Sequence, residues 1–251
     1  MLQVFALKYG ERQTTACQFF FREASHEPVT LHFFVWLILG GPYPVLVDTG
    51  FRAEDSAERG ITNFVSPAAM VEKLGVKAAD IPTALITHLH WDHWAGHALF
   101  PSAEFRIQRE EIAFWTGPVA RYDAYKAVAS APSLAALVRM SYAGRVRVVE
   151  AEREVFPGLS VRWLGGHTAG LQIVTVDTAK GRIVLTSDAA HFYRNVEHYQ
   201  PAQLFTSLPQ MLAGFDTIHA LAGDRSRSVA GHDPEVAERF KPLEPGVVQI
   251  A

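Results

Sequence analysis

The sequence has a single cysteine, Cys17, among its 251 residues. One cysteine cannot form an internal disulfide, and a structural zinc site built from several thiolates is excluded for the same reason. Residues 1–10 have no basic start, no long apolar stretch and no small-residue cleavage site, so they do not resemble a signal peptide. From these absences we expect a soluble, cytoplasmic protein.

Tracts rich in lysine or arginine are also lacking, and the formal net charge is only −3 at pH 7. The sequence therefore predicts neither a nucleic-acid groove nor a polybasic membrane contact. Residues 31–39 are apolar, but this run is too short for a bilayer span, which needs roughly 20 residues. We expect a small-molecule substrate, with no nucleic-acid or membrane partner.

No segment rich in glycine, serine or proline separates two halves of the chain, so residues 1–251 are expected to form one domain. Hydrophobic residues make up 49% of the sequence, which is enough for a multi-layered core. Strand-like segments form two groups, residues 1–107 and 145–250. This grouping predicts two packed sheets covered by helices on the outside.

Apolar runs bounded by turn residues predict the individual elements. The expected strands are 4–8 (at an edge), 31–39, 44–47, 84–87, 105–108, 145–150, 160–164, 171–176, 182–186, 228–230 and 247–250. One helix is expected to start at Pro67. Further helices are expected at 92–100, 109–115, 119–130, 132–142 and 208–222, with one more near the C-terminus.

The densest group of chemically reactive side chains follows the apolar run 84–87. His88, His90, Asp92 and His93 lie within six positions. Residues two apart in an extended segment point to the same side, so His88 and His90 can face one metal ion. If a helix begins near Trp91, Asp92 and His93 can serve a second ion. Imidazole and carboxylate groups are common ligands of zinc and similar divalent ions.

Four further polar residues also come directly after apolar strands: Asp48, His167, Asp188 and His232. If these strands run in the same direction, their ends meet at one rim of the sheets. The sequence therefore predicts that these side chains join the His88–His93 segment.

The motif His88-x-His90-x-Asp92-His93, together with His167, Asp188 and His232, resembles the metallo-β-lactamase-fold hydrolases along nearly the whole chain. This resemblance implies an α+β fold, an αββα sandwich of two mixed sheets covered by helices. It also implies two divalent ions, one bound by His88, His90 and His167, the other by Asp92, His93 and His232, with Asp188 bridging both. Asp48 matches a buried carboxylate that orders the metal-binding loop.

Within that superfamily the sequence is most similar to N-acyl homoserine lactone lactonases, through segments 47–50, 165–170, 187–190 and 231–234. Such enzymes carry a tyrosine three residues after the bridging aspartate, aimed at the substrate carbonyl. Here that position is His191, and Tyr193 follows two residues later. Both are candidates for the hydrogen-bond donor.

The resemblance implies a hydrolase that opens a lactone ring by attack of a metal-bridging hydroxide. Asp92 would move the proton, and His191 or Tyr193 would assist at the carbonyl. A thiolate-free donor set suits zinc and would accept cobalt, manganese or iron. The product would be a ring-opened hydroxy acid, and the biological role quorum quenching.

Several apolar side chains are candidates for a groove that holds an aliphatic tail: Phe19, Phe20, Phe21, Phe51, Phe64, Met70 and the helical region 119–142. The same residues could instead belong to the core or to a homodimer contact. Two other functions stay open. One is a different hydrolase on this fold, acting on another lactone, a thioester, a phosphoester or a β-lactam. The other is a metal-binding protein without catalysis.

Overall fold

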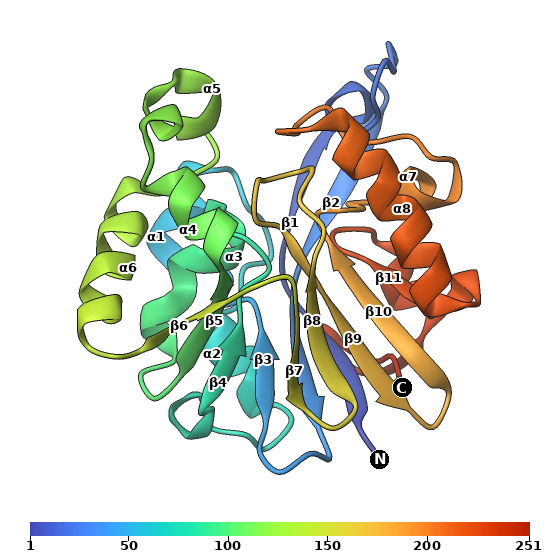
Figure 1. Cartoon of the computed structure of the whole chain (residues 1–251). Helices are drawn as coiled ribbons and strands as arrows, with labels where there is room; N and C mark the ends of the chain where they lie inside the picture. The colour runs from blue at the N-terminus through green and yellow to red at the C-terminus, as the bar shows by residue number, and fades with distance from the viewer.

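The computed structural model describes residues 1–251 as two β-sheets packed face to face, with helices on both outer sides (Figure 1). The first sheet has eight strands in the order β12-β13-β1-β2-β3-β4-β5-β6. Their bounds are β1 Gln3–Thr15, β2 Pro28–Leu39, β3 Val45–Val47, β4 Thr83–Leu85, β5 Glu104–Gln108, β6 Val146–Val149, β12 Lys241–Glu244 and β13 Val247–Gln249.

The second sheet has the order β11-β10-β9-β8-β7. Its strands are β7 Glu152–Phe156, β8 Leu159–Trp163, β9 Gln172–Thr178, β10 Gly181–Ser187 and β11 Ser228–Ala230. Both sheets mix parallel and antiparallel pairs, so the predicted αββα arrangement is confirmed.

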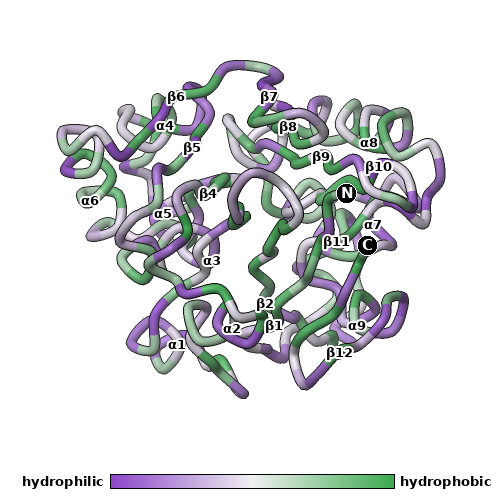
Figure 2. Tube along the Cα trace, turned by 90° about the horizontal axis from the view of Figure 1, so that it is seen from below, coloured by the Kyte–Doolittle hydropathy of each residue, from purple (hydrophilic) through white to green (hydrophobic).

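Strand β2 shows why the chain forms layers. Successive side chains of a strand point to opposite faces, so a continuous apolar run needs cover on both sides. Phe33, Val35 and Leu37 face the helices of the first layer. Phe34 and Trp36 face the second sheet. Hydrophobic segments accordingly lie along the central strands, and hydrophilic segments lie mostly at the periphery (Figure 2).

Nine α-helices complete the two outer layers (Figure 1). They are α1 Ala53–Glu58, α2 Pro67–Glu72, α3 Trp91–Trp94, α4 Arg109–Trp115, α5 Asp123–Lys126, α6 Ala131–Tyr142, α7 Tyr193–Glu197, α8 Leu208–Ala222 and α9 Glu235–Arg239. Helices α2, α3, α4 and α6 contribute to the core under the first sheet. Helix α8 packs Phe215 and Ile218 against the second sheet. None of the helices combines the length and hydrophobicity that a membrane crossing needs.

The structure corrects three of the predicted elements. Strand β1 is not an edge strand, because β13 pairs with it from the far end of the chain. The second group of strands does not form one sheet either, because β6 pairs with β5 while β12 and β13 extend the first sheet beyond β1. The predicted helix 119–130 is a 3-10 turn, Pro118–Arg121, followed by the short helix α5.

The strand ends that carry the polar residues do converge. Strands β3 and β4 are parallel, and they end just before Asp48 and the His88 segment. Strands β10 and β11 are parallel and end just before Asp188 and His232. Strand β8 is antiparallel to β9, as is β10, so the His167 loop leaves the second sheet at the same edge as Asp188. Both sheets therefore direct these residues to one rim.

Candidate metal centre

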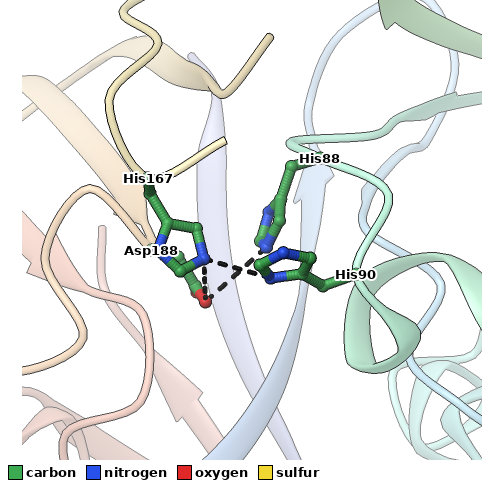
Figure 3. Close-up of side chains that lie close together, drawn as sticks. All are labelled: His88, His90, His167 and Asp188. Atoms are coloured by element: carbon green, nitrogen blue, oxygen red, sulfur yellow. Dashed lines mark hydrogen bonds and ion pairs between the residues drawn. The ribbon is translucent and has the colours of Figure 1, made fainter. Parts of the chain in front are cut away.

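Two groups of potential metal ligands meet between the sheets. The first contains His88, His90, His167 and Asp188, whose ligand atoms all lie within 4.8 Å of one another. His88 and His90 come from the first half of the chain, whereas His167 and Asp188 reach in from the second half (Figure 3). The second group consists of Asp92, His93 and His232. The structure thus brings together all seven predicted ligands.

Asp188 lies between the two groups and turns one carboxylate oxygen to each. Its Oδ2 is 3.6 Å from His88 Nε2 and 3.3 Å from His167 Nε2. Its Oδ1 is 3.2 Å from Nε2 of His93 and 3.0 Å from Nε2 of His232. A carboxylate in this position can contact two ions at once.

Oxygen partners behind three of the imidazoles fix how each ring is presented. His93 Nδ1 lies 2.8 Å from Asp48 Oδ2. His167 Nδ1 lies 2.9 Å from the carbonyl oxygen of Leu204, and His232 Nδ1 lies 3.0 Å from that of His32. Each Nδ1 can therefore donate its hydrogen to an acceptor and leave Nε2 free as a metal ligand. Outer contacts of this kind are typical of histidines that bind metals.

The donor set fits a pair of divalent ions. The buried Nε2 atoms of His88 and His93 face Asp188 but form no hydrogen bond with it, which is unusual for polar atoms in a protein interior. Burial lowers the pKa values of His88 and His90, so these rings are neutral and can coordinate. Burial raises the pKa of Asp188, but the surrounding imidazoles of His191, His93, His232 and His88 lower it well below its usual range. Burial lowers the pKa values of His93 and His232, but the Asp188 carboxylate raises both above their ordinary value, so these two rings would give up a proton when an ion binds. Imidazoles around an ionised carboxylate form a donor set that suits zinc.

A buried network beneath the site joins the two sheets. Asp48 accepts hydrogen bonds from the backbone amide of Thr87 at 2.7 Å and from its hydroxyl at 2.8 Å. The Thr87 hydroxyl also lies 2.8 Å from Ser187 Oγ, next to Asp188. Asp48 and Ser187 have positive φ angles of 61° and 46°, a strained backbone that is common at functional sites. The role expected for Asp48 agrees with this position, whereas Thr87 and Ser187 were not predicted.

Glu111 of helix α4 is a third residue near the site that was not predicted from the sequence. Its Oε1 accepts hydrogen bonds from the Leu89 amide at 2.8 Å and from Trp115 Nε1 at 2.7 Å. Its Oε2 accepts from Thr168 Oγ1 at 2.7 Å and from the Gly170 amide at 2.8 Å. Leu89 lies between two ligands of the first group, and Thr168 follows the third. One buried carboxylate thus holds both ligand-bearing loops.

Close packing at this contact explains the glycine at position 170. A Cβ atom there would lie 2.1 Å from the backbone nitrogen of Glu111. The one available signal in the sequence was the spacing of Glu111 and Trp115. Residues four apart lie on the same face of a helix, so an acidic residue shares the buried face of α4 with a tryptophan.

His191 and Tyr193, the two candidate donors to substrate, occupy different places. His191 lines the pocket, and its Nε2 is 3.0 Å from Asp188 Oδ2. Tyr193 is buried in the core between the sheets, with the Arg239 guanidinium 3.5 Å from its ring centroid. Burial raises the pKa of Tyr193 above its ordinary value. A hydrogen bond from Tyr193 to substrate does not fit this position, because Tyr193 does not line the pocket.

The metal centre opens into a pocket of about 190 Å³. Imidazoles and carboxylates form its floor: His90, Asp92, His167, Asp188, His191 and His232. Mostly apolar side chains form its walls: Phe19, Leu31, Phe33, Trp91, Val128, Ala202 and Leu204, together with the polar Arg12 and Gln18. Of the apolar groove residues expected from the sequence, Phe19 and Val128 line it. Phe20, Phe51 and Met70 are core residues instead.

Fold and site together indicate a metal-dependent hydrolase, because clustered imidazoles and carboxylates that can hold metal lie at the floor of an open pocket. The sequence model of the metallo-beta-lactamase superfamily matches residues 34–232, and the chain belongs to this superfamily.

Named relatives are lactonases. An N-acyl homoserine lactonase from a Bacillus species is 27% identical over 194 residues, which cover 71% of this chain and 68% of that protein. An N-acyl homoserine lactonase from Bacillus thuringiensis is 25% identical over 215 residues, covering 80% and 74% of the two chains.

Solved structures share the fold over almost the whole chain. An N-acyl homoserine lactone hydrolase with N-hexanoyl-L-homoserine bound at its catalytic metal centre aligns with a TM-score of 0.78 at 19% identity, covering 96% of this chain and 97% of the other. The dizinc quorum-quenching lactonase AidC aligns with a TM-score of 0.75 at 17% identity, covering 99% and 93%. At such identities the likeness establishes the fold.

Proposed function

We propose that the protein is a lactonase with two bound divalent ions, most suitably zinc, and that it opens the ring of N-acyl homoserine lactones and so acts in quorum quenching. The observation that carries the proposal is the placement of Asp188, with one oxygen toward each ligand group at the floor of the pocket. The lactonases among its relatives, at 25% and 27% identity, support the substrate class.

Two bound ions would lower the pKa of water toward about 7 and polarise the lactone carbonyl. The chain itself supplies the proton carrier. Asp92 is the most accessible of the seven ligands, with 11% of its side chain exposed, whereas the side chain of Asp188 is only 3% exposed. Asp92 also lines the pocket, so its carboxylate can hold the proton that the leaving ring oxygen needs.

The walls of the pocket suit the two parts of such a substrate. Polar ligands form the floor, where the ring would react, while Phe19, Leu31 and Leu204 offer apolar surface to an acyl chain. The small volume fits the ring and leaves the far end of a long chain at the mouth.

The substrate class is tested with a panel of homoserine lactones, other lactones, thioesters, phosphoesters and β-lactams, each followed by acid release in weak buffer. Hydrolysis of each lactone releases one proton, which the assay follows. We expect homoserine lactones to give the highest kcat/KM, because the floor of the pocket fits the preferred ring. Chelator treatment should abolish the signal, and added zinc should restore it. Faster turnover of a thioester or phosphoester would assign a different hydrolase. Full metal loading without any turnover would favour a non-catalytic protein.

His191 and Tyr193 can be separated by matched variants. If His191 donates to the substrate carbonyl, His191→Phe should lower kcat by about 10²-fold, the usual loss for one donor at a developing oxyanion. Metal content should stay at the native value, and His191→Tyr should recover part of the rate. Tyr193→Phe is the control and should leave kcat unchanged, because the Tyr193 hydroxyl lies outside the pocket. A loss confined to Tyr193→Phe would reverse the assignment.

A further inference from the structure

Arg12 is the one pocket residue whose charge neither the metal centre nor a neighbouring carboxylate uses. It belongs to β1, where it pairs with Leu31 of β2. Partners in register point to the same face of a sheet, and Leu31 and Phe33 line the same pocket wall. The Arg12 side chain is therefore directed toward the pocket by the strand itself.

No carboxylate neutralises this guanidinium. The neighbouring Glu11 faces the opposite side, where it pairs with Lys8 and accepts a hydrogen bond from Asn63 at 2.7 Å. Asp92 and Asp188, the two carboxylates of the pocket, form no ion pair with Arg12. A guanidinium carries five N–H donors, and a half-buried one without a protein acceptor is available to a ligand.

A second guanidinium, that of Arg59, lies behind the pocket lining on the Trp91 side. Arg59 lies 4.1 Å from the ring centroid of Trp91, which lines the pocket. Burial lowers the pKa of Arg59, the carboxylates of Asp92 and Asp55 raise it, and the charge of Arg12 lowers it again, so Arg12 and Arg59 are within electrostatic reach of each other. The charge of Arg59 is thus partly balanced by carboxylates, whereas Arg12 has no ion-pair partner and is the cation that an anionic group in the pocket would meet.

We propose that Arg12 is a specificity-determining residue that binds an anionic group, of the carboxylate class, on the substrate of this enzyme. The inference rests on the proposed lactonase function and refines it: the preferred lactone carries a negative charge beyond the ring. An uncharged acyl chain would leave the guanidinium facing apolar substrate, whereas a carboxylate can accept two parallel N–H bonds from it.

The test uses two lactones of equal shape, N-succinyl-homoserine lactone and N-(4-methylpentanoyl)-homoserine lactone, which differ in a carboxylate against an isopropyl group. With the metal-loaded protein we expect kcat/KM to favour the succinyl compound by about 10-fold or more, the value of one charged hydrogen bond. Arg12→Gln should remove this preference, and Arg12→Lys should keep part of it, because lysine retains the charge but not the fork. Arg153→Gln is the control, since Arg153 is exposed and unpaired on β7.

Affinity for the two ring-opened products, measured by calorimetry, gives a readout that needs no turnover. Tighter binding of N-succinyl-homoserine that is lost in Arg12→Gln supports the anion site even if neither lactone is hydrolysed, a result that would refute only the lactonase function. Hydrolysis of both lactones at equal kcat/KM, with equal product affinities, would overturn the role of Arg12 and leave the lactonase function standing.

Discussion

Replacing Asp188 by alanine should abolish hydrolysis and remove metal from both ligand groups. Each oxygen of Asp188 faces a different group, 3.3 Å from His167 Nε2 on one side and 3.0 Å from His232 Nε2 on the other. Loss of a residue behind a metal ligand typically lowers metal affinity or activity by about 10- to 100-fold, and loss of the shared ligand itself should exceed that. Metal content per chain and kcat/KM on the best substrate of the panel are the two measurements.

Two further variants make the result specific. Asp188→Asn keeps the volume and one oxygen, so it should retain more metal than the alanine variant while losing the bridging charge. Asp177→Ala removes an exposed carboxylate that pairs with Arg182 on the same sheet, and it should leave metal content and activity at native values. Full activity in Asp188→Ala would contradict the two-ion assignment, and loss of metal from only one group would show that Asp188 does not bridge.

The meeting of the candidate ligands at one rim could be predicted because they follow short-range patterns in the sequence. His88, His90, Asp92 and His93 are close in sequence, and each remaining ligand follows a strand whose apolar residues mark its end. The pairing of the strands was harder to predict. Residues Phe5 and Gln249 are partners in the first sheet, and nothing in either segment alone indicates a partner so distant along the chain.

Tyr193 shows how one backbone turn redirects a side chain. In an extended segment, His191 and Tyr193 would point to the same side because they are two residues apart. Helix α7 begins at Tyr193 instead, after the extended residue Phe192. The ring of Tyr193 therefore enters the core between the sheets, while His191 stays beside Asp188. Arg12 was equally hard to predict, because its lack of a partner is visible only in three dimensions.

Glu111 offers the sharpest test of how the loops position the metal ligands. In Glu111→Gln, one acceptor oxygen becomes an amide NH2 group, which is a donor. In one orientation it faces the N–H groups of Leu89 and Trp115, and in the other it faces the Thr168 hydroxyl and the Gly170 amide. Each buried N–H left without an acceptor should lower the free energy of unfolding by about 1–3 kcal/mol. Because Leu89 lies between His88 and His90, metal affinity should also fall, by about 10- to 100-fold. Thermal or denaturant unfolding and competition with a chromophoric chelator measure the two effects.

The two effects separate a positioning role from simple loss of stability. A merely structural Glu111 would lower the unfolding midpoint but leave the metal affinity of the folded protein unchanged at low temperature. A positioning Glu111 lowers affinity under the same conditions, and excess zinc then restores part of the activity. Thr168→Val removes one of the four donors and should have a smaller effect on both measurements. Glu238→Gln, an exposed and unpaired position on α9, is the matched control for the change of charge. Native metal affinity in folded Glu111→Gln would refute the positioning role, because the loops would then hold His88, His90 and His167 in place without the shared carboxylate.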